Sequence, residues 1–191
     1  DRVYEKAREL LDSQIKEGIY VTDPDPAYYL YELTMDGRSQ TGIVACCAVD
    51  DYINGVIKKH ENTREDKEQD RIRHVDATNA HTGPIFLAYR RQEELKRLVE
   101  QAKKEKALYD FVSEDGIRHR VWKIGDPGMV KAVEEAFEKL PAAYIADGHH
   151  RAASAVKAGL KRRQEKPDYT GKEPFNYFLS VLFPDDELMI L

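Results

Sequence analysis

The residues best suited to chemistry form one run of five: Asp147, Gly148, His149, His150 and Arg151. A short segment of small residues precedes this run and an alanine-rich segment follows it. That pattern predicts a strand, a tight loop and a helix. The N-terminus of a helix presents unpaired N–H groups and the positive end of the helix dipole, and phosphates bind there readily. We therefore predict an anion-binding site at this junction, suited to the phosphates of a nucleotide.

Each side chain of this run suggests a role. Gly148 allows the backbone to approach a ligand closely, and the Arg151 guanidinium matches the geometry of phosphate oxygens. His149 and His150 can donate hydrogen bonds to phosphate, and His150 can also transfer protons. Asp147 is predicted to orient a histidine, hold a metal ion or cap the helix. The alternative is that Asp147 is only an N-cap and that the histidines are partly buried packing groups.

A second polar cluster extends from Lys59 to Arg71. Glu61 can act as a general base for a hydroxyl group, while Lys59 and Arg71 can hold a second anionic group. Lys67 lies one helical turn before Arg71, so the two would point the same way. The alternative is a solvated helix covered with ion pairs. A polar loop at residues 79–84, just before an apolar segment, either borders a site or is only a turn.

The elements that must position these residues alternate between helical and strand periodicity. We expect helices at residues 1–17, from 67 onward, 92–102, 127–140 and 150–163. We expect strands at residues 28–34, 41–49, 84–89, 107–112, 117–124, 142–146 and 175–183. Turn residues at 36–37 and 114–116 predict two β-hairpins, the first with a loop of several residues. The fold class is therefore α/β or α+β, with a mixed sheet and flanking helices.

Composition narrows the class of protein further. Of 191 residues, 41% are hydrophobic and 34% are charged, which is typical of a globular protein and not of a disordered one. The net charge of −5 argues against a general nucleic-acid binder. Cys46 and Cys47 are adjacent, so a disulfide between them is strained, and a reducing cytoplasm fits. Neither a zinc-ligand spacing nor a membrane-spanning segment is predicted.

Several segments, taken together, resemble one known family. They are Thr41-Gly42-Ile43-Val44-Ala45, Lys59-His60-Glu61, Asp70-Arg71, Gly83-Pro84-Ile85-Phe86 and Ala146-Asp147-Gly148-His149-His150-Arg151. In this order they are similar to the bacterial and archaeal domain-of-unknown-function family 1015, over residues 28–183. Members of that family are about twice as long as this chain. The resemblance therefore implies that residues 1–191 are one domain, a fragment of a longer protein.

The Asp147–Arg151 run is also similar to the phosphate-binding signature of the ParB and sulfiredoxin-like superfamily. This superfamily includes nucleotide-dependent partition proteins, the sulfinic-acid reductase sulfiredoxin and free serine kinases. The resemblance implies a ParB/sulfiredoxin-like core in which Gly148, His149, His150 and Arg151 bind nucleotide phosphates. Histidines stand here where sulfiredoxin has its catalytic cysteine, which argues against sulfinic reduction. Free serine kinases use a glutamate base, and Glu61 is the candidate for that role.

Three functions follow as expectations. The first is a phosphotransferase that moves phosphate from ATP, ADP or pyrophosphate, with Mg²⁺, to a small hydroxyl compound such as free serine. The second is a nucleotide-dependent binding or regulatory module without catalysis. The third is an interaction protein whose charged clusters only keep it in solution. The expected partners are a nucleotide and a small-molecule substrate, and a homodimer is compatible with the sequence; nucleic acid and membranes are not expected.

Overall fold

A computed structural model describes residues 2–188 of the chain, so the predicted domain, residues 1–191, extends slightly past it at both ends. The helices are α1 (Arg2–Lys16), α2 (Val49–Ile53), α3 (Glu65–Thr78), α4 (Glu93–Ala102), α5 (Pro127–Glu138) and α6 (His149–Glu165), with short 3-10 turns η1 (Pro174–Asn176) and η2 (Asp185–Glu187). The strands are β1 (Tyr28–Met35), β2 (Arg38–Ala48), β3 (Ile57–Lys58), β4 (Ile85–Tyr89), β5 (Tyr109–Val112), β6 (Arg118–Ile124), β7 (Ala143–Asp147) and β8 (Tyr177–Pro184).

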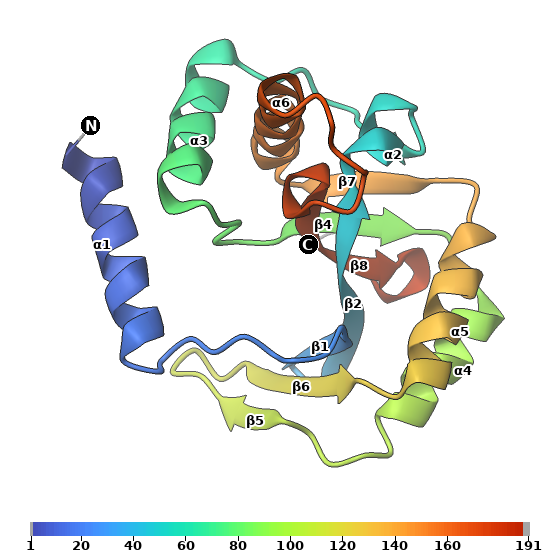
Figure 1. Cartoon of the computed structure of the whole chain (residues 1–191). Helices are drawn as coiled ribbons and strands as arrows, with labels where there is room; N and C mark the ends of the chain where they lie inside the picture. The colour runs from blue at the N-terminus through green and yellow to red at the C-terminus, as the bar shows by residue number, and fades with distance from the viewer. Residues whose placement is uncertain (1, 189–191) are drawn as a thin grey trace.

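All of these strands belong to one sheet with the order β3-β7-β4-β8-β2-β1-β6-β5 (Figure 1). The β3–β7 and β4–β8 pairs are parallel, and the other neighbouring strands are antiparallel. The predicted α/β class with a mixed sheet and flanking helices is therefore confirmed. No helix in the described part of the chain combines the length and apolar character needed to cross a membrane.

The first hairpin is tighter than the sequence analysis predicted. Only Asp36 and Gly37 connect β1 to β2, and their φ angles are +52° and +78°. Positive φ at both central positions is the signature of a type I′ turn, whose twist matches that of the flanking strands. Met35 and Arg38 consequently pair across the turn. The predicted loop of several residues was wrong, because an Asp-Gly pair can make the whole connection.

Two short elements, α2 and β3, occupy a region that the sequence analysis left without regular structure. Ile57 of β3 is buried and pairs with Ala143 of β7, and Lys58 pairs with Tyr144. The pairing is parallel, so both strands end at the same edge of the sheet. The residues that follow β3, beginning with Lys59, therefore lie beside the loop that follows β7. This edge is where the two predicted polar clusters can meet.

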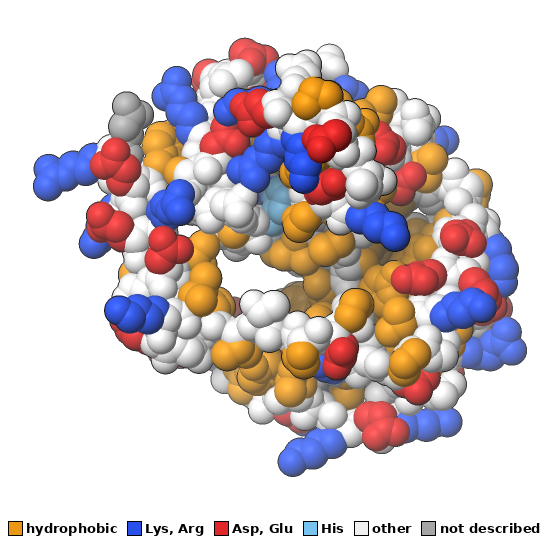
Figure 2. All heavy atoms as spheres, viewed as in Figure 1, with side chains coloured by type: hydrophobic (Ala, Val, Ile, Leu, Met, Phe, Trp, Pro, Cys, Tyr) orange, Lys and Arg blue, Asp and Glu red, His pale blue; other side chains and the backbone are white. Residues whose placement is uncertain are grey.

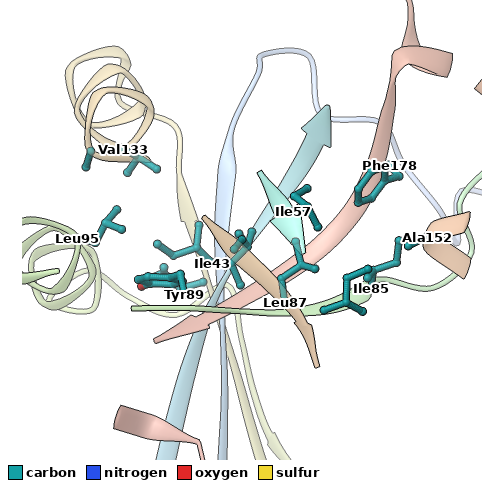
Figure 3. Close-up of a cluster of buried hydrophobic side chains, with 14 of the residues drawn as sticks. Ile43, Ile57, Ile85, Leu87, Tyr89, Leu95, Val133, Ala152 and Phe178 are labelled. Atoms are coloured by element: carbon teal, nitrogen blue, oxygen red, sulfur yellow. The ribbon is translucent and has the colours of Figure 1, made fainter. Parts of the chain in front are cut away.

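The core fixes α6 against the sheet (Figure 3). Ala152 of α6 lies beside Ile85 at one end of the buried cluster, while Leu95 of α4 and Val133 of α5 pack at the other end. The buried residues of α6 are mostly small, and Ala152 and Ala155 belong to the core cluster that the helix shares with the sheet. Such small side chains let the helix backbone approach the strands closely. The start of α6 is thus held rigidly at the end of β7.

The remaining helix, α1, lies apart from this core. Each of its residues is exposed or half-buried, and it packs against α3, where the Tyr4 hydroxyl donates a hydrogen bond to Asp70 (2.6 Å). Figure 2 shows this face hollowed between α1, α3 and the strands β1 and β6. Hydrophobic side chains surround the opening, and Lys and Arg side chains gather above it over α3 and α6.

Candidate functional site

The junction between β7 and α6 has the predicted strand–loop–helix form. Gly148 is the N-cap residue, with φ +91° and ψ 27°, and α6 begins at His149. Since L-amino acids with a side chain rarely adopt a φ in this range, glycine is the natural residue here. No side chain among residues 2–188 caps this helix. The first N–H groups of α6 are therefore free to bind an anion.

Asp147 does not cap α6. It is the last residue of β7, and the N-cap position belongs to Gly148, so the predicted capping role was wrong. The β4–β7 ladder shifts register between Phe86 and Leu87, and Phe86 pairs with Asp147. Bulges of this kind redirect side chains and are frequent next to active sites. Here the Asp147 side chain is exposed at the edge of the junction.

The imidazole of His149 meets the segment that follows β3. Its Nδ1 atom lies 3.7 Å from Oε2 of Glu61, and its ring stacks edge-to-face on that of His60, with centroids 4.4 Å apart. Nε2 of His60 lies 4.0 Å from Oε1 of Glu61. Burial, and then the nearby His60, lower the pKa of His149, whereas Glu61 and Asp147 act in the opposite direction. His149 is therefore a largely neutral imidazole at pH 7.

On the other side of the same helix turn, Arg151 and Arg71 line a small pocket together with Thr82, Gly83 and His74. Its volume is about 50 Å³, whereas a single water needs about 10–15 Å³ by such a measure. Arg151 donates a long hydrogen bond to the carbonyl of Pro84 (3.5 Å). The pocket is thus lined by two arginines, and its volume is large enough for a compact anion.

Arg151 reaches across Gly83 because that residue has no side chain. A Cβ atom at Gly83 would lie only 2.5 Å from Nη1 of Arg151. On the opposite wall, the ring of His74 is held by a hydrogen bond between Nε2 and the Thr82 hydroxyl (3.2 Å). The polar loop before β4 therefore borders the pocket, and its role in a functional site stays a prediction.

A buried carboxylate anchors the segment that carries His60 and Glu61. Glu68, on the first turn of α3, is only 3% exposed and accepts a hydrogen bond from the Thr63 hydroxyl. It also pairs with Lys157 of α6. Burial on its own would raise the pKa of Glu68, but the hydrogen bonds from Lys157 and Thr63 hold it below its usual value. One charged contact thus joins the loop, α3 and α6.

A hydroxyl on α6 completes this link. The Ser154 hydroxyl donates its hydrogen to the carbonyl of His150 (2.6 Å), and the carbonyl of Glu68 lies within reach of the same hydrogen (3.2 Å). Ser154 is 1% exposed, so both contacts are shielded from water. The start of α6 and the start of α3 are held at a fixed separation by this side chain.

With this geometry in view, the chain was compared with known proteins. A family model described as Protein of unknown function (DUF1015) matches residues 1–191. The chain belongs to the DUF1015 family. Neither the curated proteins nor the solved structures with which it was compared include a match. The family predicted from the motifs is therefore confirmed, and the likeness to ParB and sulfiredoxin stays a prediction.

The two predicted clusters of this DUF1015 chain meet at two points. Glu61 faces His149, and Arg71 shares a pocket with Arg151. Lys59 is oriented differently: its ammonium lies over the ring of Tyr52 in α2, 5.7 Å from the centroid. It therefore stands beside the site, and its predicted contact with an anion requires the side chain to turn.

His60 and His74 are site residues that the sequence analysis did not single out. Each lies in a charged stretch whose neighbouring residues were the predicted site residues. His60 stands between Lys59 and Glu61, and His74 is one helical turn after Arg71. The signal available was helical spacing for His74. For His60 the decisive fact is the two-residue strand β3, which has no signature in the sequence.

Proposed function

We propose that this DUF1015 protein binds the phosphates of a nucleotide or of pyrophosphate at the start of α6 and transfers one phosphate to a small hydroxyl compound. The observation that carries this proposal is that three features lie around the first turn of one helix. They are the uncapped N–H groups of α6, the pocket lined by Arg71 and Arg151, and the carboxylate of Glu61 next to His149.

The cationic pocket is the part suited to the phosphate donor. Guanidinium groups bind phosphate oxygens in a bidentate manner, and the dipole of α6 adds a partial positive charge at the same place. As the terminal phosphate transfers, charge spreads over its oxygens, and positioned cations stabilise that charge. Arg151 and Arg71 are the groups placed to do this, and Mg²⁺ brought by the nucleotide would supplement them.

Glu61 is the candidate base. Its side chain is 63% exposed, so a hydroxyl substrate can reach it from solvent. In the proposed step the substrate hydroxyl gives its proton to Glu61, and its oxygen forms a bond to the terminal phosphorus. The bond between that phosphorus and the bridging oxygen breaks, so that ATP leaves as ADP, ADP as AMP, or pyrophosphate as phosphate. The predicted acceptor to test first is free serine.

A phosphotransfer assay tests this function directly. Wild-type protein would be incubated with ATP, ADP or pyrophosphate, Mg²⁺ and a panel of hydroxyl compounds. Because a positioned general base contributes about 10²- to 10⁴-fold in rate, Glu61→Gln should lower turnover by that factor while nucleotide binding persists. Full turnover in Glu61→Gln would remove Glu61 as the base. Binding without transfer by the wild type would favour the alternative, a nucleotide-dependent regulatory module.

A further inference from the structure

We infer that His60, Glu61 and His149 form a binding site for a divalent transition-metal ion, with Zn²⁺ the ion that fits the ligand set best. One potential ligand atom from each of these residues lies within 4.8 Å of the other two. The inference goes beyond phosphate transfer and does not depend on it, because a metal can bind here whether or not the pocket at Arg151 takes a nucleotide. With the metal bound, Glu61 is a ligand, so its role as the base in phosphate transfer belongs to the metal-free protein.

The state of His149 is the first reason. The side chain is only 6% exposed, and its Nε2 atom has no hydrogen-bond partner among the residues that the structure describes. The neighbour of Nδ1 is Oε2 of Glu61 at 3.7 Å, which is too long for a hydrogen bond. Burying an imidazole without partners costs free energy. A metal ion between His149 and Glu61 would bind Nδ1, the ring nitrogen that faces the carboxylate and has no hydrogen bond to it.

The spacing of the three ligands is the second reason. Ligand atoms about 2.0–2.2 Å from a tetrahedral metal lie roughly 3.4 Å apart. The separations here are 3.7 Å from Nδ1 of His149 to Oε2 of Glu61 and 4.0 Å from Nε2 of His60 to Oε1, the other oxygen of the same carboxylate. One ligand atom from each residue lies within 4.8 Å of the other two, so the ligands must close in slightly around the ion. His60 and Glu61 are both about 60% exposed and free to move by the small distance required. His149, the buried member, would provide the fixed ligand.

The ligand types decide between metals. Two imidazoles with one carboxylate are typical of catalytic zinc sites, which keep a position open for water or substrate. Mg²⁺ prefers oxygen ligands and retains much of its water. The cluster should therefore select Zn²⁺ or Co²⁺ over Mg²⁺. At the open position a water molecule, a phosphate oxygen or a hydroxyl group would complete the coordination.

Direct metal titration tests the site without any activity assay. Untagged protein, stripped of metal with a chelator, would be titrated with Zn²⁺ by calorimetry and with Co²⁺ by visible absorption, which reports the coordination geometry. We expect one ion per chain, unaffected by excess Mg²⁺. His60→Ala and Glu61→Ala, both at exposed positions, should each weaken binding by at least about tenfold and alter the Co²⁺ spectrum.

The matched control is His119→Ala, which removes a histidine from β6, outside the cluster. It should bind both ions as the wild type does. Wild-type affinity in His60→Ala and Glu61→Ala would overturn the inference, as would a wild-type chain that binds neither ion. Pyrophosphate binding measured separately in the presence of chelator reports on the α6 pocket alone, so failure of the metal site and failure of the proposed function remain distinguishable.

Discussion

At the scale of single residues, the anion site depends on backbone geometry as much as on charge. Gly148 has a φ of +91° at the turn from β7 into α6, and as the N-cap residue it leaves the first N–H groups of the helix without a side-chain cap. A side chain at this position would have ordinary contacts with Ile85, so the cost of adding one comes from the backbone conformation itself. The glycine is therefore a requirement of the turn and not of packing.

Gly148→Ala should lower the free energy of unfolding by about 1–2 kcal/mol, the cost of a left-handed conformation for an L-residue. It should also weaken pyrophosphate binding, because relief of the strain rotates the N–H groups of α6. Urea unfolding and calorimetry measure the two effects. Gly171→Ala is the matched control, since Gly171 has nearly the same φ, +90°, in the loop before η1. Equal loss of binding in both variants would contradict a local role for Gly148.

At the scale of elements, the site is assembled by two parallel strands that end side by side. His60 and Glu61 follow β3, whereas Asp147 ends β7 and His149 begins α6. The contact between Thr63, Glu68 and Lys157 holds the segment after β3 against α3 and α6. Removing one partner of a buried ion pair or hydrogen bond is costly, because the other partner is left buried and unpaired. The position of Glu61 thus depends on an anchor that Glu61 itself does not touch.

Thr63→Val tests this anchor. Removing the hydroxyl leaves one oxygen of the buried Glu68 without its donor, which should cost about 1–3 kcal/mol of stability. Faster amide hydrogen exchange in residues 59–64 is the more specific expectation, because the segment is released from α3. Thr34→Val removes a comparable hydroxyl contact, to Ser39, in the exposed β1–β2 hairpin. If exchange in residues 59–64 is the same in both variants, Thr63 does not anchor the segment.

The elements also show what the sequence can and cannot predict. Apolar periodicity predicted the main helices and strands, and the small-residue strand before Gly148 predicted the anion-binding junction. By contrast, β3 is two residues long and exists only because Ile57 and Lys58 pair with β7. Such pairing is a tertiary effect that local propensity does not contain. The sequence could not predict that Glu61 approaches His149 for the same reason, because the pairing of β3 positions Glu61.

At the scale of the whole molecule, a second buried carboxylate joins the far half of the sheet. Glu32 of β1 is fully buried and pairs with Lys103, at the end of α4, and with Arg120 of β6. Thr41 of β2 donates a further hydrogen bond to it (2.9 Å). Burial on its own would raise the pKa of Glu32, but these partners hold it below its usual value. The cluster ties three strands and a helix together, away from the site.

This cluster predicts a pH dependence of stability. A carboxyl whose pKa is lower in the folded state contributes stability above its unfolded pKa, and that contribution is lost as pH falls through the folded pKa. For Glu32 the loss should begin near pH 4.5 and grow below it. Glu32→Gln should lower the free energy of unfolding by about 3–5 kcal/mol at pH 7, because two cations lose their partner. It should also make the free energy of unfolding fall less steeply at acid pH. Glu114→Gln, at an exposed turn, should change neither the stability at pH 7 nor its fall at acid pH.

The most direct test of the central claim is thermal unfolding with and without pyrophosphate or ADP, in the wild type, Arg151→Ala and Arg97→Ala. A ligand that binds only the folded state at 100 times its dissociation constant adds about 2.7 kcal/mol of stability. The site at the start of α6 predicts a clear rise in melting temperature for the wild type and for Arg97→Ala, an exposed arginine on α4, and its loss in Arg151→Ala. The same rise in Arg151→Ala, or none in the wild type, would contradict the account.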